Sequence, residues 1–164
     1  MKRIVSAIFL ATLLCSLFCG CSLLEASPKT FSASGMSITL TEDFTERDYV
    51  SFTATYDSQY VAVFALKETF DLIDATGVLS RNSTTEEYAK FVIQGNQLDC
   101  EPVSENGLLS FVYQSENNGV DYTYFATIHK SSDAFWMIQF ATKTSNFEKQ
   151  KDNILTYAKS ISFS

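Results

Sequence analysis

The chain has 164 residues, 46% of them hydrophobic, and its 19 acidic and 12 basic residues give a formal net charge of −7. This length suits one globular domain with one hydrophobic core. The phosphate backbone of nucleic acids repels an acidic protein, and no run of Lys or Arg offsets that repulsion. The composition therefore excludes a nucleic-acid-binding role.

The N-terminus has the pattern of an export signal. Lys2 and Arg3 precede an apolar run over residues 4–18, and the small residue Gly20 follows the run. Counted to Leu24, the apolar segment is about 21 residues long, so a retained membrane-spanning anchor is the alternative.

The junction Phe18-Cys19-Gly20-Cys21 resembles the lipobox of bacterial lipoproteins, which usually has Leu and a small residue where this chain has Phe18 and Cys19. The resemblance implies cleavage after Gly20, diacylglycerol on the Cys21 thiol and often another acyl chain on its amine. Two or three acyl chains anchor a protein stably. We therefore expect residues 1–20 to be a signal peptide, residues 21–30 a lipid-anchored tether, and residues 31–164 a single domain at the outer face of a bacterial membrane.

One cysteine remains for the domain, because Cys15 and Cys19 leave with the signal peptide and Cys21 carries lipid. Cys100 then has no disulfide partner, so packing alone must stabilise the domain. Its acidic neighbours disfavour a thiolate, and we expect a buried or merely tolerated thiol.

His129 is the only histidine in the chain. Nucleophilic catalysis of the usual kind needs a base oriented by an acid, and zinc needs three or four ligands that are mostly nitrogen or sulfur. The sequence therefore predicts no metal site, no cofactor and no catalytic role for His129, which we expect to be solvated at a strand end.

Strand patterns fill the first part of the domain. Residues 31–33 and 36–40 flank Ser34-Gly35, which predicts a hairpin. Apolar and polar residues alternate over residues 50–56, as in a half-buried strand. Residues 60–66 are apolar on both faces, which favours a central strand covered on both sides.

Residues 68–82 show no periodicity, and they contain three carboxylates: Glu68, Asp71 and Asp74. Long loops often carry function, so we take these three as a candidate ligand-facing group. With backbone carbonyls they could hold Ca²⁺, although no EF-hand spacing is present. A solvated acidic loop is the alternative.

A first helix follows, with two overlapping capping-box registers at its start: Ser83 with Glu86, and Thr84 with Glu87. Gly95-Asn96 predicts its end. The apolar residues at helical spacing are Tyr88, Phe91 and Val92.

The second half continues as a meander. Strands are predicted over residues 98–103, 108–114, 120–129 and 134–143, with Asn-Gly pairs at 106–107 and 118–119 for tight turns. A second helix opens with a Ser145 and Glu148 capping box, and its apolar face is formed by Phe147, Ile154, Leu155 and Ala158. Residues 161–163 form a last short strand.

This order of elements indicates an α+β fold: an antiparallel sheet of about six to eight strands packed with two main helices. The pattern resembles the PsbP/Mog1 fold as found in small bacterial lipoproteins, through the strand at 35–40, the helix start at 83–88, the strand at 135–140 and the closing segment 157–161. The resemblance implies an α/β/α sandwich with a non-enzymatic accessory or binding role. An all-antiparallel sandwich or barrel is the alternative.

These observations favour a membrane-anchored extracytoplasmic module, not an enzyme, that binds an envelope protein or ligand through the sheet and residues 68–82. The alternative is a carboxylate-dependent envelope hydrolase, because only the three-dimensional structure sets the distance between two carboxylates.

Tyr122 and Tyr124 share one strand face and Phe125 points to the other. Such aromatics usually pack in a core, and the alternative hypothesis is an exposed tyrosine platform for a sugar or a peptide.

Overall fold

The computed structural model describes residues 26–164. The predicted signal peptide, the alternative membrane-spanning anchor and the lipid attachment site Cys21 lie outside these residues. From residue 26 to residue 164, no helix has the length and apolar character needed to cross a bilayer.

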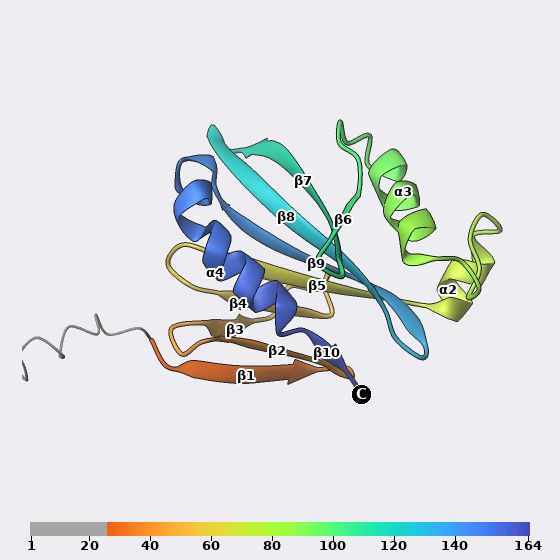
Figure 1. Cartoon of the computed structure of the whole chain (residues 1–164), viewed down its shortest axis with the longest axis horizontal. Coiled ribbons are helices and arrows are strands. Elements are labelled where there is room, and N and C mark those ends of the chain that lie inside the picture. The colour runs from red at the N-terminus through yellow and green to blue at the C-terminus, as the bar shows by residue number, and fades with distance from the viewer. Residues whose placement is uncertain (1–25) are drawn as a thin grey trace, which may run out of the picture.

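Ten strands and three α-helices are described (Figure 1). The strands are β1 Pro28–Ala33, β2 Met36–Thr41, β3 Thr45–Arg47, β4 Ala54–Asp57, β5 Ala62–Thr69, β6 Val103–Glu105, β7 Leu108–Asn117, β8 Val120–Lys130, β9 Ala134–Lys143 and β10 Ser162–Phe163. The helices are α2 Phe70–Ala75, α3 Thr85–Gly95 and α4 Phe147–Lys159, and a 3-10 turn, Thr144–Asn146, precedes α4.

The strands form two antiparallel sheets, one of seven strands in the order β3-β4-β5-β9-β8-β7-β6 and one of three in the order β1-β2-β10. The seven-stranded sheet is the middle layer. On β9, Trp136, Ile138 and Phe140 are buried with α4 and the small sheet on one side. Phe135 and Met137 point to the other side, where α2 and α3 lie. The α+β class and the sandwich of helices on both sheet faces are therefore confirmed.

Three hairpins have two-residue turns with positive φ at both turn residues: Ser34 and Gly35 (53° and 93°), Asn106 and Gly107 (50° and 80°), and Asn118 and Gly119 (52° and 76°). Turns of this hand match the twist of the strands they join. The turns predicted at these three positions are confirmed.

The strand predicted over residues 50–56 is wrong in its first half. Residues 48–53 form a loop in which the Phe52 N–H donates to the Tyr49 carbonyl (2.9 Å) and Val50 is fully exposed. The rings of Tyr49 and Phe52 reach back to Phe64 on β5. Alternation favoured a strand because aromatic residues that fold back from a loop give the same sequence pattern. The short strand β3 was not predicted.

Residues 68–82 are not irregular throughout, which corrects the sequence interpretation. β5 extends to Thr69, and α2 buries Ile73 in the core beneath α3. The Lys130 ammonium donates to the carbonyls of Arg81 and Ser83 (2.7 and 2.8 Å) and so holds the following turn. A six-residue helix with one buried side chain is too short to show periodicity.

At the start of α3, the structure selects the second of the two capping registers. The Thr84 hydroxyl accepts from the Glu87 N–H (3.1 Å), and the Glu87 carboxylate accepts from the Thr84 N–H (2.7 Å). Ser83 instead accepts from the Ser80 N–H (3.1 Å). Its hydroxyl stabilises the preceding turn and not the helix.

The strand predicted over residues 98–103 is also wrong, because the chain there completes the end of α3. Gln97 has a φ of 54°, and the Leu98 N–H donates to the Ile93 carbonyl (3.0 Å). This left-handed helix end places Leu98 against the core cluster beneath α3. The strand therefore begins only at Val103.

The capping box predicted at Ser145 does not form. Asn146 precedes α4 and makes no side-chain cap bond, while Thr144 in the 3-10 turn shares a hydrogen bond with Thr123 on β8 (3.0 Å). A tertiary contact thus replaces the local cap. The helix face predicted around Ile154 and Ala158 is confirmed, since both residues are 1% exposed.

Candidate functional site

The sheet face that carries α2 and α3 is covered over only part of its area. On β8, Ala126 and Ile128 are buried beneath α3, whereas Tyr122 and Tyr124, on the same face of the same strand, are half-buried. A hollow of about 640 Å³ lies over the uncovered part. We name it the tyrosine trough and define it by its floor and walls: Ala62, Ala141, Tyr49, Phe64, Tyr122 and Tyr124.

The floor of the tyrosine trough is made of small residues on the two central strands. Ala62 on β5 is the cross-strand partner of Ala141 on β9, and Ala141 pairs in turn with Tyr124 on β8. Side chains on one face of neighbouring strands stand side by side, so two methyl groups next to aromatic rings leave a depression.

Aromatic rings form the two walls. On one side the rings of Tyr124 and Tyr113 stack with centroids 4.8 Å apart and planes inclined by 5°. On the other side Phe64 contacts Phe52 and Tyr49, with centroid distances of 4.9 and 6.4 Å. Aromatic pairs of this kind hold one another in fixed orientations.

The rim is polar and offers both donors and acceptors. The Arg47 Nε lies 3.6 Å from the Asp57 Oδ2, and the two side chains are 58% and 29% exposed. Lys143 and the amides of Asn117 and Asn146 line other parts of the rim. A ligand in the tyrosine trough would therefore meet apolar surface in the middle and hydrogen-bonding groups at the edge.

Tyr113 and Tyr124, which stack on each other in one wall, are neutral at physiological pH. Burial, and next the neighbouring Tyr124, raises the pKa of Tyr113 to about 12. Burial, and next Tyr122, raises the pKa of Tyr124. Both side chains therefore keep their hydroxyl hydrogens, so each can donate as well as accept a hydrogen bond.

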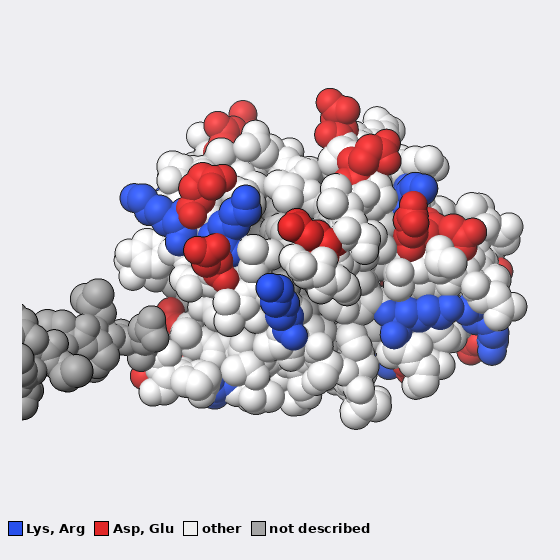
Figure 2. Space-filling view, viewed as in Figure 1, with Lys and Arg blue, Asp and Glu red and all other residues white. Residues whose placement is uncertain are grey.

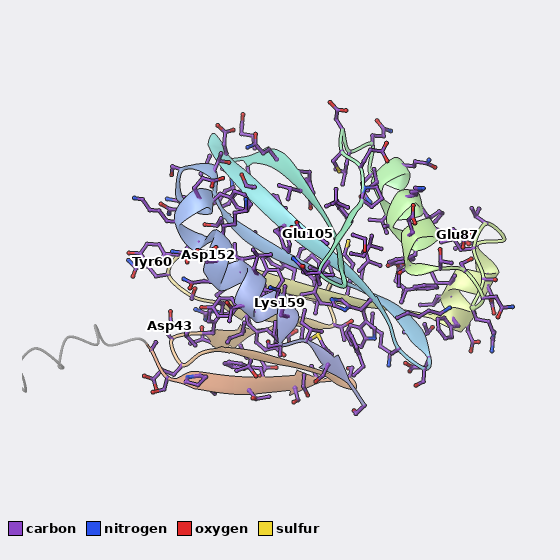
Figure 3. The ribbon with its side chains drawn as sticks, in the orientation of Figure 1. Asp43, Tyr60, Glu87, Glu105, Asp152 and Lys159 are labelled. Atoms are coloured by element: carbon purple, nitrogen blue, oxygen red, sulfur yellow. The ribbon has the colours of Figure 1, made fainter. Side chains whose placement is uncertain are left out.

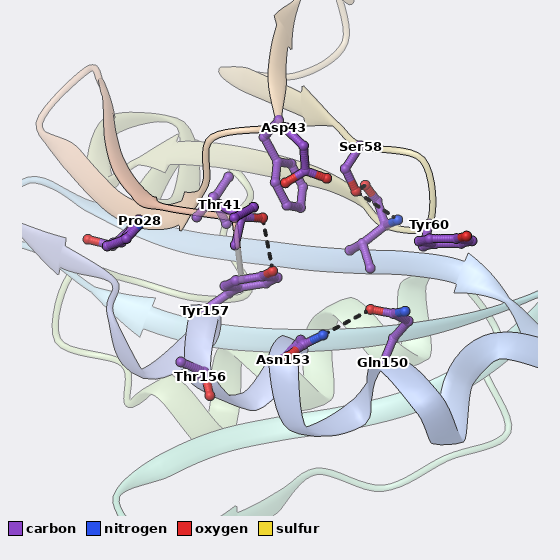
Figure 4. A pocket seen from close by; sticks show the side chains of 14 residues that line it. Pro28, Thr41, Asp43, Ser58, Tyr60, Gln150, Asn153, Thr156 and Tyr157 are labelled. Atoms are coloured by element: carbon purple, nitrogen blue, oxygen red, sulfur yellow. Dashed lines mark hydrogen bonds between the residues drawn. The ribbon is translucent and has the colours of Figure 1, made fainter. Parts of the chain in front are cut away.

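A second hollow, of about 660 Å³, lies between α4 and the end of β2 (Figure 4). We call it the α4 groove. Tyr157 of α4 shares a hydrogen bond with Thr41 of β2 (3.2 Å), and Asn153 donates to Gln150 one turn earlier (3.3 Å). Tyr60, in the β4–β5 turn, lines both this groove and the tyrosine trough.

Tyr60 and Asp43 project at the end of the molecule where the described chain begins, and Glu87 lies at the opposite end (Figure 3). On the face seen in Figure 2, acidic and basic side chains are interspersed with uncharged areas. Charge therefore does not single out a binding surface on that face.

The three carboxylates of the candidate ligand-facing group are not gathered around one point, because two of them share Arg81 and the third is bonded by Tyr88. Asp71 and Asp74 both bind the Arg81 guanidinium (3.3 and 2.9 Å), and the hydrogen bond from Arg81 lowers the pKa of Asp74. Glu68 lies on β5 and accepts a hydrogen bond from the buried hydroxyl of Tyr88. Among the described residues, no three His, Cys, Asp or Glu side chains are placed to hold a metal ion.

His129 is not a solvated strand-end residue, which corrects the sequence expectation. It is half-buried, with its Nε2 3.0 Å from the Thr127 hydroxyl and its ring centroid 5.5 Å from that of Phe163. Burial lowers the pKa of His129 to about 4. The imidazole is therefore neutral near pH 7.

Cys100 is half-buried, and burial, followed by Glu101 and Asp99, raises the pKa of its thiol. A thiol with a raised pKa forms little thiolate near neutral pH, so it is a poor nucleophile.

The sequence pointed to one wall of the tyrosine trough and missed the other. Tyr122 and Tyr124 lie on an open face, as the platform hypothesis required, but Phe64 was expected to be covered. β5 is covered on both faces only around Leu66, which packs against the cluster under α3. Arg47, Asp57 and Tyr49 were not predicted as site residues, because nothing in the sequence indicated that β3 pairs with β4 or that loop 48–53 places Tyr49 against Phe64.

No protein-family model matches the sequence, and no curated protein matches it. Solved structures do match. The solution structure of cyanobacterial PsbP (CyanoP) from Synechocystis sp. PCC 6803 has a TM-score of 0.51 at 12% identity, and the match covers 89% of this chain and 97% of that chain. The fold is PsbP-like.

Two other structures are similar. A protein of Bacteroides thetaiotaomicron VPI-5482 has a TM-score of 0.53 at 9% identity over 86% of this chain, which spans only 49% of that protein. LpqN of Mycobacterium tuberculosis, a protein involved in cell envelope biogenesis, has a TM-score of 0.43 at 10% identity, with 84% of this chain and 90% of that chain covered. The similarity to CyanoP, at 12% identity, shows the fold alone.

Proposed function

We propose that this protein is a membrane-anchored extracytoplasmic lipoprotein that acts as a non-catalytic binding module, with the tyrosine trough as its ligand site. The observation that carries the proposal is the trough itself. The domain leaves aromatic side chains half-exposed around a hollow on a sheet face that it covers elsewhere. A concave surface with apolar walls and a polar rim is the usual form of a ligand site in proteins.

The sequence at residues 18–21 supports anchoring, and the chain geometry is compatible with it. β1 begins at Pro28, so at most about 25 Å of extended chain separates Cys21 from the sheet. Anchored in this way, the domain would meet ligands within a short distance of the membrane.

Acylation is tested by growing cells with labelled palmitate and fractionating them. We expect label in the wild-type protein and in Cys19→Ser, and none in Cys21→Ser. Label that persists in Cys21→Ser would contradict the lipoprotein assignment. The Cys19→Ser variant is the matched control, because it removes the neighbouring thiol and keeps Gly20-Cys21.

Ligand binding is tested with the full-length protein in detergent and bacterial envelope fragments washed free of lipid. We expect the wild-type protein to sediment with the fragments and Tyr124→Ala to remain in solution. Leu72→Ala, which removes a 63%-exposed apolar side chain from α2 far from the trough, is the control and should sediment. Equal sedimentation of Tyr124→Ala and wild type would contradict the proposed site.

A further inference from the structure

The floor of the tyrosine trough restricts how a ligand can be recognised. β5 pairs with both β4 and β9, and β9 pairs with both β5 and β8. The main-chain groups beneath the trough are therefore used within the sheet, and an extended peptide cannot add to it as another strand. Recognition must come from side chains.

The walls favour a ligand with flat apolar faces. Tyr124 is held by its stack with Tyr113, and Phe64 by its contact with Phe52. Rings fixed in this way present their faces at low entropic cost. A pyranose ring has C–H groups on its faces, which pack on an aromatic ring, and its hydroxyl groups point outward at the edge.

The rim matches those hydroxyl groups. Asp57 offers acceptors and Arg47 offers donors only 3.6 Å away, so neighbouring hydroxyls could donate to one and accept from the other. The charges of Arg47 and Asp57 balance at this part of the rim, and Lys143 is the one other charged residue among those that line the trough. The amides of Asn117 and Asn146 add groups that both donate and accept.

We propose that the tyrosine trough binds a neutral oligosaccharide of the envelope, with sugar rings packed between Tyr124 and Phe64 and their hydroxyls bonded at the Arg47–Asp57 rim. This inference rests on the proposed function, because it names the ligand class of the same site. One class of ligand then matches all three features of the trough: the small residues of the floor, the aromatic walls, and the donors and acceptors of the rim.

The test uses full-length protein in a polyoxyethylene detergent, because sugar-based detergents would compete. Calorimetric titrations with maltotetraose, cellotetraose, chitotetraose and mannotetraose each extend to about 10 mM, well above the range of weak specific binding. We expect at least one to bind. Tyr124→Ala should weaken that binding by about tenfold, the effect of one lost aromatic stack, and Leu72→Ala should not change it.

A further substitution tests the role of the rim. Asp57→Asn keeps the size of the side chain and removes its charge, and we expect it to weaken the same sugar by several fold. Melting temperatures of all variants identify any that fail to fold, and Phe64→Leu then replaces Tyr124→Ala as the wall variant. No binding of any of the four sugars, or binding that neither wall variant weakens, overturns the inference.

The envelope sedimentation assay distinguishes a failure of this inference from a failure of the proposed function. Periodate oxidation of the fragments cleaves the vicinal diols of glucose and mannose units, so it should abolish sedimentation if a glucose or mannose tetrasaccharide is the sugar that binds. Internal 4-linked N-acetylglucosamine units have no vicinal diol, so if chitotetraose is the sugar that binds, added chitotetraose should abolish sedimentation instead. Protease digestion should leave sedimentation unchanged in either case. Sedimentation that needs Tyr124 but survives periodate and is lost on protease treatment would retain the binding module and overturn the oligosaccharide. Sedimentation independent of Tyr124 would overturn the proposed function itself.

Discussion

Acidification from pH 7 to pH 5 should destabilise the domain through His129. Burial holds the pKa of His129 at about 4 in the folded protein, against about 6.5 in an unfolded chain. Between these two values the unfolded state binds more protons than the folded state, so stability falls as the pH falls. The full difference corresponds to about 3 kcal/mol, and about 2 kcal/mol of it is lost between pH 7 and pH 5.

This histidine is a clean probe, because it is the only one in the chain. Carboxylates whose pKa is lowered by their partners, such as Asp74 and Asp133, titrate in the folded protein at lower pH. His129→Gln removes the titrating group and keeps an amide that can still bond the Thr127 hydroxyl. Carboxylate effects therefore cancel when the two proteins are compared.

The measurement is urea unfolding of both proteins at pH 7, 6 and 5. It is followed by circular dichroism and by fluorescence of Trp136, the only tryptophan, which is 1% exposed. We expect the wild type to lose about 2 kcal/mol more than His129→Gln over this range. Two unfolding free energies that fall in parallel would show that the folded imidazole accepts a proton as readily as the unfolded one, and would refute the reasoning.

Three further predictions concern stability, each measured by urea unfolding near pH 7. Thr84→Ala should cost about 1 kcal/mol because it removes the capping hydroxyl; no loss would contradict the assigned register. Tyr56→Phe should leave stability unchanged or raise it by about 1 kcal/mol, since its buried hydroxyl has no partner among the described residues; a clear loss would reveal a hidden partner. Ile138→Ala should cost about 3 kcal/mol because Ile138 is fully buried, whereas Val112→Ala at a 41%-exposed site should stay within about 0.5 kcal/mol; equal effects would contradict the burial of β9.

The sequence alone was sufficient wherever a few neighbouring residues decide the conformation. Asn118-Gly119 makes its turn because both residues tolerate positive φ, and Thr84 and Glu87 cap a helix through two bonds that span three residues. The ends of β9 were also predicted correctly, because a long apolar run between polar segments has clear limits.

Local reasoning failed where contacts distant in sequence changed the outcome. The Ser145 cap gave way to a contact between Thr144 and Thr123, and Leu98 was drawn into the core instead of a strand. In each case a contact with another part of the chain decided the conformation: a hydrogen bond to β8 for Thr144, and burial of an apolar side chain for Leu98.

In the candidate site, too, the sequence predicted some features and only the tertiary structure decided the others. The alternation of β8 was enough to place Tyr122 and Tyr124 on one face. That this face is open at Tyr124 and closed at Ala126 depends on where α3 docks and on which strands lie beside β8. Pairing of β9 with both β5 and β8 brings Ala62, Ala141 and Tyr124 into one row. Sequence periodicity fixes which side of its own strand a residue faces, but only the tertiary structure decides what, if anything, covers that side, because cover is supplied by chain segments far away in the sequence.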